Sequence, residues 1–197
     1  VTKKVRVLLG LDVTSHDKVA AFVDGLKRQR TRVDILIHAA GVATWQLSSS
    51  IYPGTTEPMK LETLDYDLVA RAFEINAVGP LRLTEAFLRQ GMLEPGAKIA
   101  FVSSKLGSIG SNTELGSNYA YRMSKSALNA AGRSLSIDLR PRGMSVVLLH
   151  PGYVRTPMTG GGGDVTAGVS AAGLYQQIVN SPASGSFVDY DGRSVPW

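Results

Sequence analysis

The chain has no cysteine among its 197 residues, which excludes disulfides and thiolate chemistry. It also has no apolar run of the roughly 18 residues that a membrane-spanning helix requires, so we expect no membrane partner. Its first residues, Val1-Thr2-Lys3-Lys4, do not form a signal peptide, and no methionine opens the chain. We therefore expect a protein of the cytoplasm, or of an organelle stroma or matrix if a targeting segment was removed upstream.

Acidic residues are scarce at the start of the chain. Residues 1–32 contain eight Lys or Arg and three Asp, so the whole net charge of +5 lies there. The remainder has thirteen basic and thirteen acidic residues and is neutral. A nucleic-acid surface would spread or stripe its basic residues over the fold, so we favour a solvated helix face with a basic end. A nucleic-acid-associated protein is the weakest of the functions that we consider.

The sequence also lacks a metal-binding pattern. Its three histidines, His16, His38 and His150, are scattered without the spacing of metal ligands. We therefore expect no metal site.

The order of the segments indicates the fold. With 44% hydrophobic and 19% charged residues, the composition is that of one globular domain spanning residues 1–197. Short apolar runs alternate with longer helical ones, which is typical of a parallel sheet covered by helices, an α/β fold. The expected strands are Val5–Leu11, Val33–Ala39, Ala97–Ser103, Met144–His150 and Phe187–Val188. The expected helices are Ser15–Gln29, Leu64–Arg89, Ser117 or Asn118 to about Leu139, and Val169–Val179, with a long polar loop from Val42 to about Glu62.

In such sheets, sites form where the strands end at their carboxyl edge. The residues that directly follow predicted strands are Asp12, Gly41, Ser103-Ser104 and Pro151-Gly152. We expect these residues to converge at one edge of the sheet.

Tyr121 and Lys125 lie four residues apart at the start of a long Ala- and Leu-rich segment. On a helix these positions share a face, about 6 Å apart at Cβ, so we expect the ammonium near the phenol oxygen. A nearby cation lowers the pKa of a tyrosine from about 10, towards the range where proton transfer to a substrate oxygen is efficient. Tyr119 has Met123 in the matching position, so the register selects Tyr121. Alone, this spacing is more often a solvated surface pair.

Two more polar residues have both a chemical and a structural interpretation. Ser104, at a predicted strand end, can donate a hydrogen bond to a carbonyl oxygen, although serine after a strand is usually part of a turn. Asn76 falls in the middle of a predicted helix, where asparagine is a poor helix former. A buried amide needs partners, so Asn76 either holds a water or a backbone carbonyl, or merely bends the helix.

Together these four residues resemble the Asn-Ser-Tyr-Lys tetrad of the short-chain dehydrogenase/reductase superfamily, and the resemblance covers essentially the whole chain. Three further segments are similar to family motifs. Leu11-Asp12-Val13 resembles the turn that touches adenine. His38-Ala39-Ala40-Gly41 resembles the Asn-Asn-Ala-Gly segment, with His38 replacing an asparagine. Pro151-Gly152-Tyr153-Val154-Arg155-Thr156 resembles the Pro-Gly motif at the nicotinamide carboxamide.

The interval between Ser104 and Tyr121 exceeds the usual one in this superfamily by several residues. The insertion from Gly107-Ser108-Ile109 onward, the segment Tyr119-Ala120-Tyr121-Arg122 and the ending Phe187-Val188-Asp189-Tyr190-Asp191-Gly192 are similar to the C-factor and sniffer-type carbonyl reductase branch.

The resemblance implies a Rossmann-like parallel sheet with helices on both faces, NADP or NAD as cofactor, and a small carbonyl or alcohol as substrate. Tyr121 would be the general acid/base, Lys125 would lower its pKa and hold the nicotinamide ribose, and Ser104, with Ser103 as the alternative, would orient the carbonyl. Asn76 would hold a water that links Lys125 to solvent. The implied cofactor-binding residues are Asp12, Val13, Ala39, Ala40, Gly41, Tyr121, Lys125, Pro151, Gly152, Val154 and Thr156. Four apolar residues either line a substrate pocket or are ordinary packing: Trp45, Ile51, Tyr52 and Met158.

One family motif is missing: the glycine-rich phosphate loop, Thr-Gly-x-x-x-Gly-x-Gly. Only Gly10 and Gly25 precede Gly41, and neither builds such a loop. By the resemblance, the chain begins just before the third strand and lacks two strands and two helices. It is then part of a longer enzyme, a catalytically silent subunit of a larger assembly, or a chain whose sheet a partner completes. The intact tetrad favours the enzyme, and a homodimer or homotetramer is a further expectation.

Overall fold

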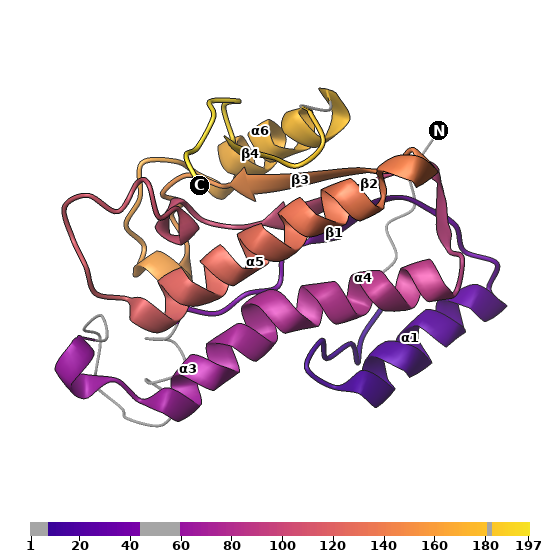
Figure 1. The fold of residues 1–197 in the computed structure, drawn as a ribbon, viewed down its shortest axis with the longest axis horizontal. Coiled ribbons are helices and arrows are strands. Elements are labelled where there is room, and N and C mark those ends of the chain that lie inside the picture. Colours follow the sequence, from indigo (N-terminus) through magenta and orange to yellow (C-terminus); the bar gives the residue numbers. More distant parts are fainter. Residues whose placement is uncertain (1–7, 44–59, 181–182) are drawn as a thin grey trace.

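A computed structural model describes residues 8–43, 60–180 and 183–197 of the protein. Four strands form one parallel sheet in the order β1-β2-β3-β4, so that chain neighbours are also spatial neighbours (Figure 1). The strands are β1 (Val33–His38), β2 (Leu93–Val102), β3 (Ser145–His150) and β4 (Ser186–Asp189). The α/β prediction is confirmed, and four of the five expected strands are present.

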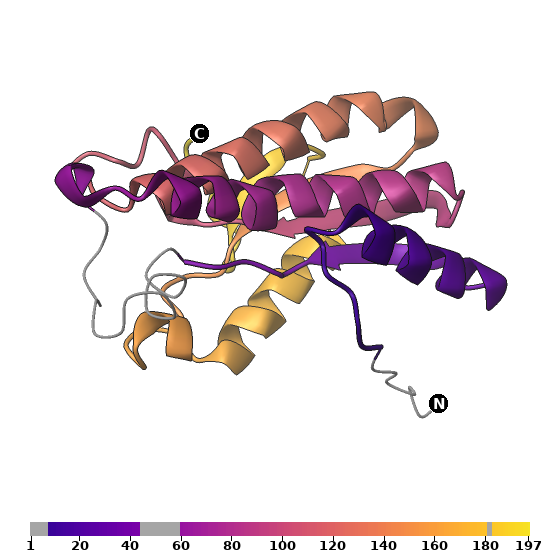
Figure 2. The same cartoon turned by 90° about the horizontal axis from the view of Figure 1, so that it is seen from below.

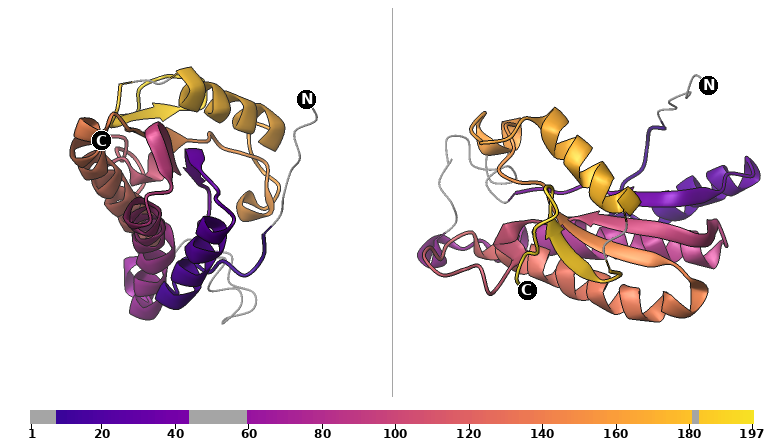
Figure 3. Two further views of the ribbon diagram at one scale, coloured as in Figure 1. Left: turned by 90° about the vertical axis from the view of Figure 1, so that its right-hand side faces the viewer. Right: turned by 90° about the horizontal axis from the view of Figure 1, so that it is seen from above.

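The helices lie on both faces of the sheet, as the sequence predicted. They are α1 (His16–Arg28), α3 (Tyr66–Phe73), α4 (Gly79–Arg89), α5 (Tyr119–Asp138) and α6 (Ala167–Asn180). Figures 2 and 3 show α4 and α5 on one side of the sheet and α6 on the other, with α1 beside α4. Short 3₁₀ turns at Leu61–Thr63, Lys105–Gly107, Arg140–Arg142 and Pro157–Thr159 occur in the connections.

Alternating side chains of the central strands divide the core into two layers. Ile99, Phe101 and Val146 belong to the large cluster that also contains α1, α4 and α5 side chains. Their strand neighbours Ala100 and Val147 belong to the smaller cluster that α6 completes. Side chains of successive strand residues point to opposite faces, so this alternation holds the three-helix layer and α6 on opposite sides.

The prediction of a strand at Val5–Leu11 is wrong for residues 8–11, the part of it that the structure describes. Residues 8–11 form no strand, and residues 5–7 lie outside the described residues. Gly10 has a φ of +92°, a left-handed conformation that interrupts an extended strand, and Leu9 is 89% exposed. Within the described part of the chain, β1 therefore pairs on one side only, with β2.

The helix expected at Leu64–Arg89 is continuous but not uniform. It begins at α3, where the Asp65 side chain accepts hydrogen bonds from two backbone N–H groups. Between α3 and α4, residues Glu74–Val78 form a π-helical turn that contains Asn76. Such wide turns are rare and occur frequently at functional sites.

The start of α5 also differs from the expectation. Asn118 occupies the capping position, but its side chain makes no capping hydrogen bond. Ser117 and Asn118 both have left-handed backbones, with φ of +58° and +53°. This conformation is uncommon outside glycine, although asparagine tolerates it better than most residues. The chain thus enters the helix through a sharp turn directly before Tyr119.

No helix in the described ranges is both long and apolar enough to cross a membrane.

Candidate active site

Tyr121 and Ser104 meet where α5 begins beside the carboxyl end of β2. Tyr121 lies in the first turn of α5 and is buried, with 8% of its surface exposed. Ser104 follows β2 and caps the 3₁₀ turn Lys105–Gly107, accepting the Leu106 N–H at 3.1 Å. Ser104 is near enough to the Tyr121 phenol to act on it as a hydrogen-bond donor, which lowers the pKa of the phenol. The structure therefore brings together two residues that are far apart in the sequence.

Lys125 lies one turn further along α5, on the same face as Tyr121. Its side chain is buried, and its Nζ lies 5.8 Å from the centroid of the Tyr121 ring. Nζ donates a hydrogen bond to the Val102 carbonyl at 2.9 Å, at the end of β2. The two side chains therefore lie on one face of α5 with the ammonium over the ring, and its proximity to the phenol oxygen remains a prediction.

The expected lowering of the Tyr121 pKa is wrong in direction for this arrangement. Burial raises the pKa of Tyr121 above 10, because the interior disfavours the charged phenolate, and the hydrogen bond with Ser104 offsets only part of this effect. Burial also lowers the pKa of Lys125 to about 8. At neutral pH the phenol therefore holds its proton, and most of Lys125 is charged.

The close approach of the Ser104 turn to α5 depends on Gly107. A Cβ added at Gly107 would lie 2.7 Å from Cβ of Lys125, a separation that real side chains do not show. The Gly107 carbonyl accepts hydrogen bonds from Ser126 and Asn129 of α5. Any larger residue would push the turn, and Ser104 with it, away from Tyr121.

Asn76 connects the site to the segment that follows β1. Its Oδ1 accepts the Val42 N–H at 2.8 Å, and its Nδ2 donates to the Val42 carbonyl at 2.9 Å and to Ser124 Oγ at 3.0 Å. Both amide hydrogens are thus used. Of the uses considered for this buried amide, the structure shows the one that holds a backbone carbonyl.

The predicted Ala39-Ala40-Gly41 segment passes directly by the tetrad. A Cβ added at Gly41 would lie 3.3 Å from both Asn76 Oδ1 and Lys125 Nζ. The ammonium of Lys125 has three N–H donors, and among the described residues only the Val102 carbonyl accepts from it. Two buried donors beside a glycine fit a diol such as the nicotinamide ribose.

The other predicted cofactor residues lie in ordered turns. Asp12 Oδ1 accepts from the Thr14 N–H and hydroxyl, and Arg82 of α4 donates to the Val13 carbonyl at 2.6 Å, which anchors this turn to α4. Pro151 and Gly152 follow β3 directly. Beyond them, Val154 pairs with Val165, and Thr156 caps the turn Pro157–Thr159. The described residues thus include the turn that is predicted to touch the adenine and the segment predicted at the nicotinamide, but no turn with the glycine pattern of the phosphate loop.

The two serines at the end of β2 have different partners. Ser103 donates from its hydroxyl to Asn129 Oδ1 at 2.6 Å, so its side chain is directed into the α5 interface. Of these two serines, Ser104 is the one that acts on the Tyr121 phenol. Sequence reasoning missed Asn129, although Tyr121, Lys125 and Asn129 follow one another at intervals of four, a polar stripe on one helix face.

His38, which replaces an asparagine of the family motif, is a core residue. Its ring stacks on Phe101 with centroids 4.8 Å apart, and Nε2 lies 2.8 Å from Thr84 Oγ1. Burial lowers the pKa of His38 to about 4, so the ring is neutral at physiological pH. In the part of the chain that the structure describes, no three His, Asp or Glu side chains gather to hold a metal.

A cavity of about 570 Å³ opens next to Ser104. Its lining comes from the turn after Ser104, the segment after β3 and the C-terminal tail: Lys105, Ser111, His150, Gly152, Tyr153, Asp164, Val165, Asp189, Tyr190, Arg193, Ser194, Val195 and Pro196. Of the four predicted pocket residues, Met158 lies in the turn after Thr156, and Trp45, Ile51 and Tyr52 lie outside the described residues.

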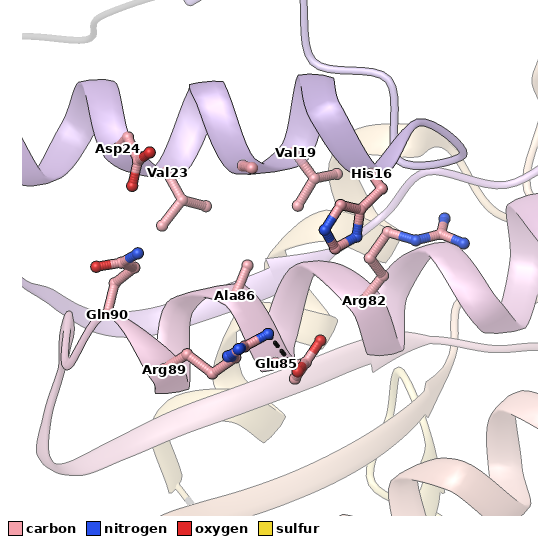
Figure 4. Close-up of a pocket in the computed structure, with 10 residues that line it drawn as sticks. His16, Val19, Val23, Asp24, Arg82, Glu85, Ala86, Arg89 and Gln90 are labelled. Atoms are coloured by element: carbon pink, nitrogen blue, oxygen red, sulfur yellow. Dashed lines mark hydrogen bonds and ion pairs between the residues drawn. The ribbon is translucent and has the colours of Figure 1, made fainter.

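A second cavity, of about 320 Å³, lies between α1 and α4 (Figure 4). His16 and Val19 project from α1 and Ala86 from α4, while Arg89 pairs with Glu85 at its edge. Its lining comes from α1, α4 and Gln90 and includes no residue that follows Ser104, so we assign it no part in the chemistry.

The insertion after Ser104 packs against the end of the chain. The Gly110 N–H donates to the Trp197 carbonyl at 2.7 Å, and the Trp197 ring lies against Phe187 with centroids 5.7 Å apart. Two segments that carried the resemblance to one branch of the superfamily are therefore neighbours in space.

Comparisons with known proteins agree with this geometry. The family profile described as enoyl-(acyl carrier protein) reductase matches residues 2–179. The C-signal protein of Myxococcus xanthus is 46% identical over 171 residues, covering 84% of this chain and 93% of that protein. The structure of the carbonyl reductase Sniffer of D. melanogaster superposes with a TM-score of 0.82 at 30% identity, covering 96% of this chain and 77% of that one. The NADPH-bound carbonyl reductase from chicken fatty liver superposes with a TM-score of 0.81 at 28% identity, covering 95% of this chain and 75% of that one.

Proposed function

The chain belongs to the short-chain dehydrogenase/reductase superfamily, in its C-factor-like and sniffer-like carbonyl reductase branch, and we propose that this oxidoreductase interconverts a carbonyl compound and an alcohol through Tyr121. One observation carries the proposal. The buried phenol of Tyr121 faces the Ser104 side chain, and its ring lies 5.8 Å from the ammonium of Lys125. A structural role alone does not require this set of polar groups, since burying them costs free energy.

The protonation states support the reducing direction. Because burial raises the pKa of Tyr121, the phenol keeps its proton at neutral pH and can donate it to a carbonyl oxygen as that oxygen gains negative charge. With substrate bound, the single hydrogen of the Ser104 hydroxyl would turn from the phenol to the same carbonyl oxygen, which would then accept from both side chains. In the oxidising direction, Tyr121 would take the proton back from the alcohol.

The proposed cofactor is NADP or NAD, which supplies or accepts the hydride at its nicotinamide ring when it is bound. Lys125 would hold the ribose hydroxyls with its two remaining donors, beside Gly41. Pro151, Gly152, Val154 and Thr156 would contact the nicotinamide, and the Asp12-Val13 turn the adenine. The NADPH-bound chicken carbonyl reductase, whose structure matches 95% of this chain, supports NADP.

The role of Asn76 is proposed in two parts. Its bonds to Val42 and Ser124 hold the segment after β1 against α5, and the Ser124 hydroxyl in turn donates to the Tyr121 carbonyl at 2.9 Å. Asn76 therefore supports the backbone of the proton-donating residue. The predicted water between Lys125 and solvent remains a prediction.

A catalytically silent subunit is the second candidate, and one observation favours it. On the side away from β2, β1 has no strand partner among the described residues, and Ile37 in this strand is 47% exposed. An unpaired strand edge is a template for pairing with another chain. A partner that completes the sheet would occupy this edge. Pairs of copies would instead use the outer surface of α4 and α5, where Leu81, Met123 and Ile137 are exposed.

Replacing Tyr121 by Phe tests the proposed function. We expect the protein to reduce 4-nitrobenzaldehyde with NADPH or NADH, and Y121F to lose at least about 100-fold in kcat while binding the cofactor with unchanged affinity. Cofactor binding is measured by tryptophan fluorescence. Clear binding of NADPH would count against the silent subunit, whereas equal turnover by the wild type and Y121F would reject this mechanism.

A further inference from the structure

The position of Ser104 depends on contacts with two consecutive residues of β3. On one side of Ser104, the Ser103 N–H donates to the Leu149 carbonyl at 2.7 Å, which extends the ladder between β2 and β3. On the other side, the Lys105 N–H donates to Nδ1 of the His150 side chain at 3.1 Å. The imidazole therefore accepts the next hydrogen bond after the strand pairing ends.

This contact leaves Ser104 between two fixed backbone groups. The Leu106 N–H, one residue further on, bonds to Ser104 Oγ itself, and the Gly107 N–H bonds to the Ser104 carbonyl at 2.8 Å. The turn is thus closed internally by Ser104. The bond to His150 connects its first N–H to the sheet, so rotation of the turn would break that bond.

We propose that His150 is a positioning residue for the proposed reaction: its Nδ1 accepts the Lys105 N–H and thereby holds the Ser104 hydroxyl against Tyr121. The catalytic part of this inference rests on the proposed function, whereas the hydrogen bond itself does not. Only a neutral imidazole with its hydrogen on Nε2 can accept at Nδ1.

The surroundings of His150 keep the ring neutral in the physiological range. Burial lowers the pKa of His150 below 6.5; nearby Lys105 lowers it further, and Asp189 of β4 partly opposes this. Asp189 is itself near the guanidinium of Arg193, 3.6 Å away, and Asp164 lies in the lining of the same cavity. Protonation of His150 would set an N–H donor against the Lys105 N–H and release the turn.

Three substitutions separate acceptance at Nδ1 from the other properties of the ring. In H150N the amide Oδ1 takes the place of Nδ1 and can accept the same hydrogen bond. In H150Q, the matched amide, the oxygen takes the place of Nε2 instead, and H150A has no acceptor. The variants are compared by the thermal unfolding midpoint to show that each is folded.

The first measurement needs no turnover. In the wild type and in H150N, we expect slow hydrogen exchange at the Lys105 amide, and exchange at least about tenfold faster in H150A and H150Q. In the wild type, this protection is lost as the pH falls through the pKa of His150, and in H150N it is not. Equal exchange at Lys105 in the wild type and all three variants would overturn the proposal.

The second measurement is the reduction of 4-nitrobenzaldehyde with NADPH. We expect H150A and H150Q to lose about tenfold in kcat with a smaller change in KM, because the reacting hydroxyl is misplaced. The kcat of H150N should lie within about threefold of the wild-type value. The kcat of the wild type should fall as the pH drops through the pKa of His150, and the kcat of H150N should not. Loss of kcat in H150N as large as in H150Q would overturn the proposal. If the wild type turned over no carbonyl while the exchange pattern held, the positioning would stand and the proposed function would fail.

Discussion

The ammonium of Lys125 lies over the ring of Tyr121, 5.8 Å from its centroid, and donates to the Val102 carbonyl at the end of β2. This one side chain therefore connects the helix that carries the phenol to the strand that leads to Ser104. Burial lowers the pKa of Lys125 to about 8, so this side chain loses its positive charge within a pH range that can be measured.

The first prediction concerns that charge. Lys125 is charged below pH 8 and loses its charge above it, so we expect kcat/KM to decline as the pH rises through about 8. K125M, which keeps the length of the side chain without the ammonium, should lower kcat/KM by about 100-fold and show no such decline. The measurement is the pH profile of both proteins. A decline of equal size in K125M would assign it to another group.

The second prediction separates the two serines. S104A should lower kcat by about 100-fold, since it removes the hydroxyl that faces the Tyr121 phenol. S103A should change kcat less than about fivefold but lower the free energy of unfolding by about 1–2 kcal/mol, because the buried Oδ1 of Asn129 loses its donor. Urea unfolding and steady-state kinetics on both variants check this. If S103A lost more activity than S104A, the assignment would be reversed.

The third prediction uses the narrow space at Gly41. A Cβ there would lie 3.3 Å from Lys125 Nζ, which is tighter than most side-chain contacts, so G41A should displace the ammonium and weaken NADPH binding by about tenfold. Gly168 provides the control, since a Cβ there would meet nothing within 4 Å. Fluorescence titration of both variants is the test, and equal affinities would show that the segment at Gly41 can move aside.

The fourth prediction concerns stability in acid. The pKa of His38 is about 4 in the folded chain and about 6.5 when unfolded, so the folded state favours the neutral ring. Its contribution is complete above pH 6.5 and is lost as the pH falls towards 4, by up to about 3 kcal/mol. H38N removes the titrating group. Urea unfolding at pH 7 and pH 4.5 should therefore show a larger loss in the wild type than in H38N.

Much of the fold follows from patterns that the sequence displays directly. The nearly continuous apolar run at Val33–Ala39 predicts a strand buried in a parallel sheet, and β1 is found at Val33–His38. Ser15 or Thr14 is expected to cap the first helix, and the Ser15 hydroxyl is the one that accepts the Lys18 N–H at the start of α1. The spacing of Tyr121 and Lys125 predicts their shared face. These are local features, so local patterns suffice to predict them.

Other features depend on surroundings that no local pattern reveals. The run Val5–Leu11 has strand composition, yet residues 8–11 have no neighbouring strand among the described residues and stay irregular. The direction of the Tyr121 pKa depends on how completely the ring is buried, which the sequence does not give. In the sequence, His150 has no spacing typical of a metal ligand, and no other role is expected for it. Its contact with Lys105 arises because β2 and β3 end side by side.

The wide turn at Glu74–Val78 has a consequence for the whole rod formed by α3 and α4. Leu68 and Phe87 are both buried, yet they lie nineteen positions apart. At roughly 100° per residue, an unbroken α-helix would point them about 100° away from each other. One additional residue accommodated in the π-helical turn cancels this offset. The π-helical turn thus shifts the helical register by one residue. Because of this shift, the buried side chains of both α3 and α4 face the interior, and Asn76 is buried within the turn itself.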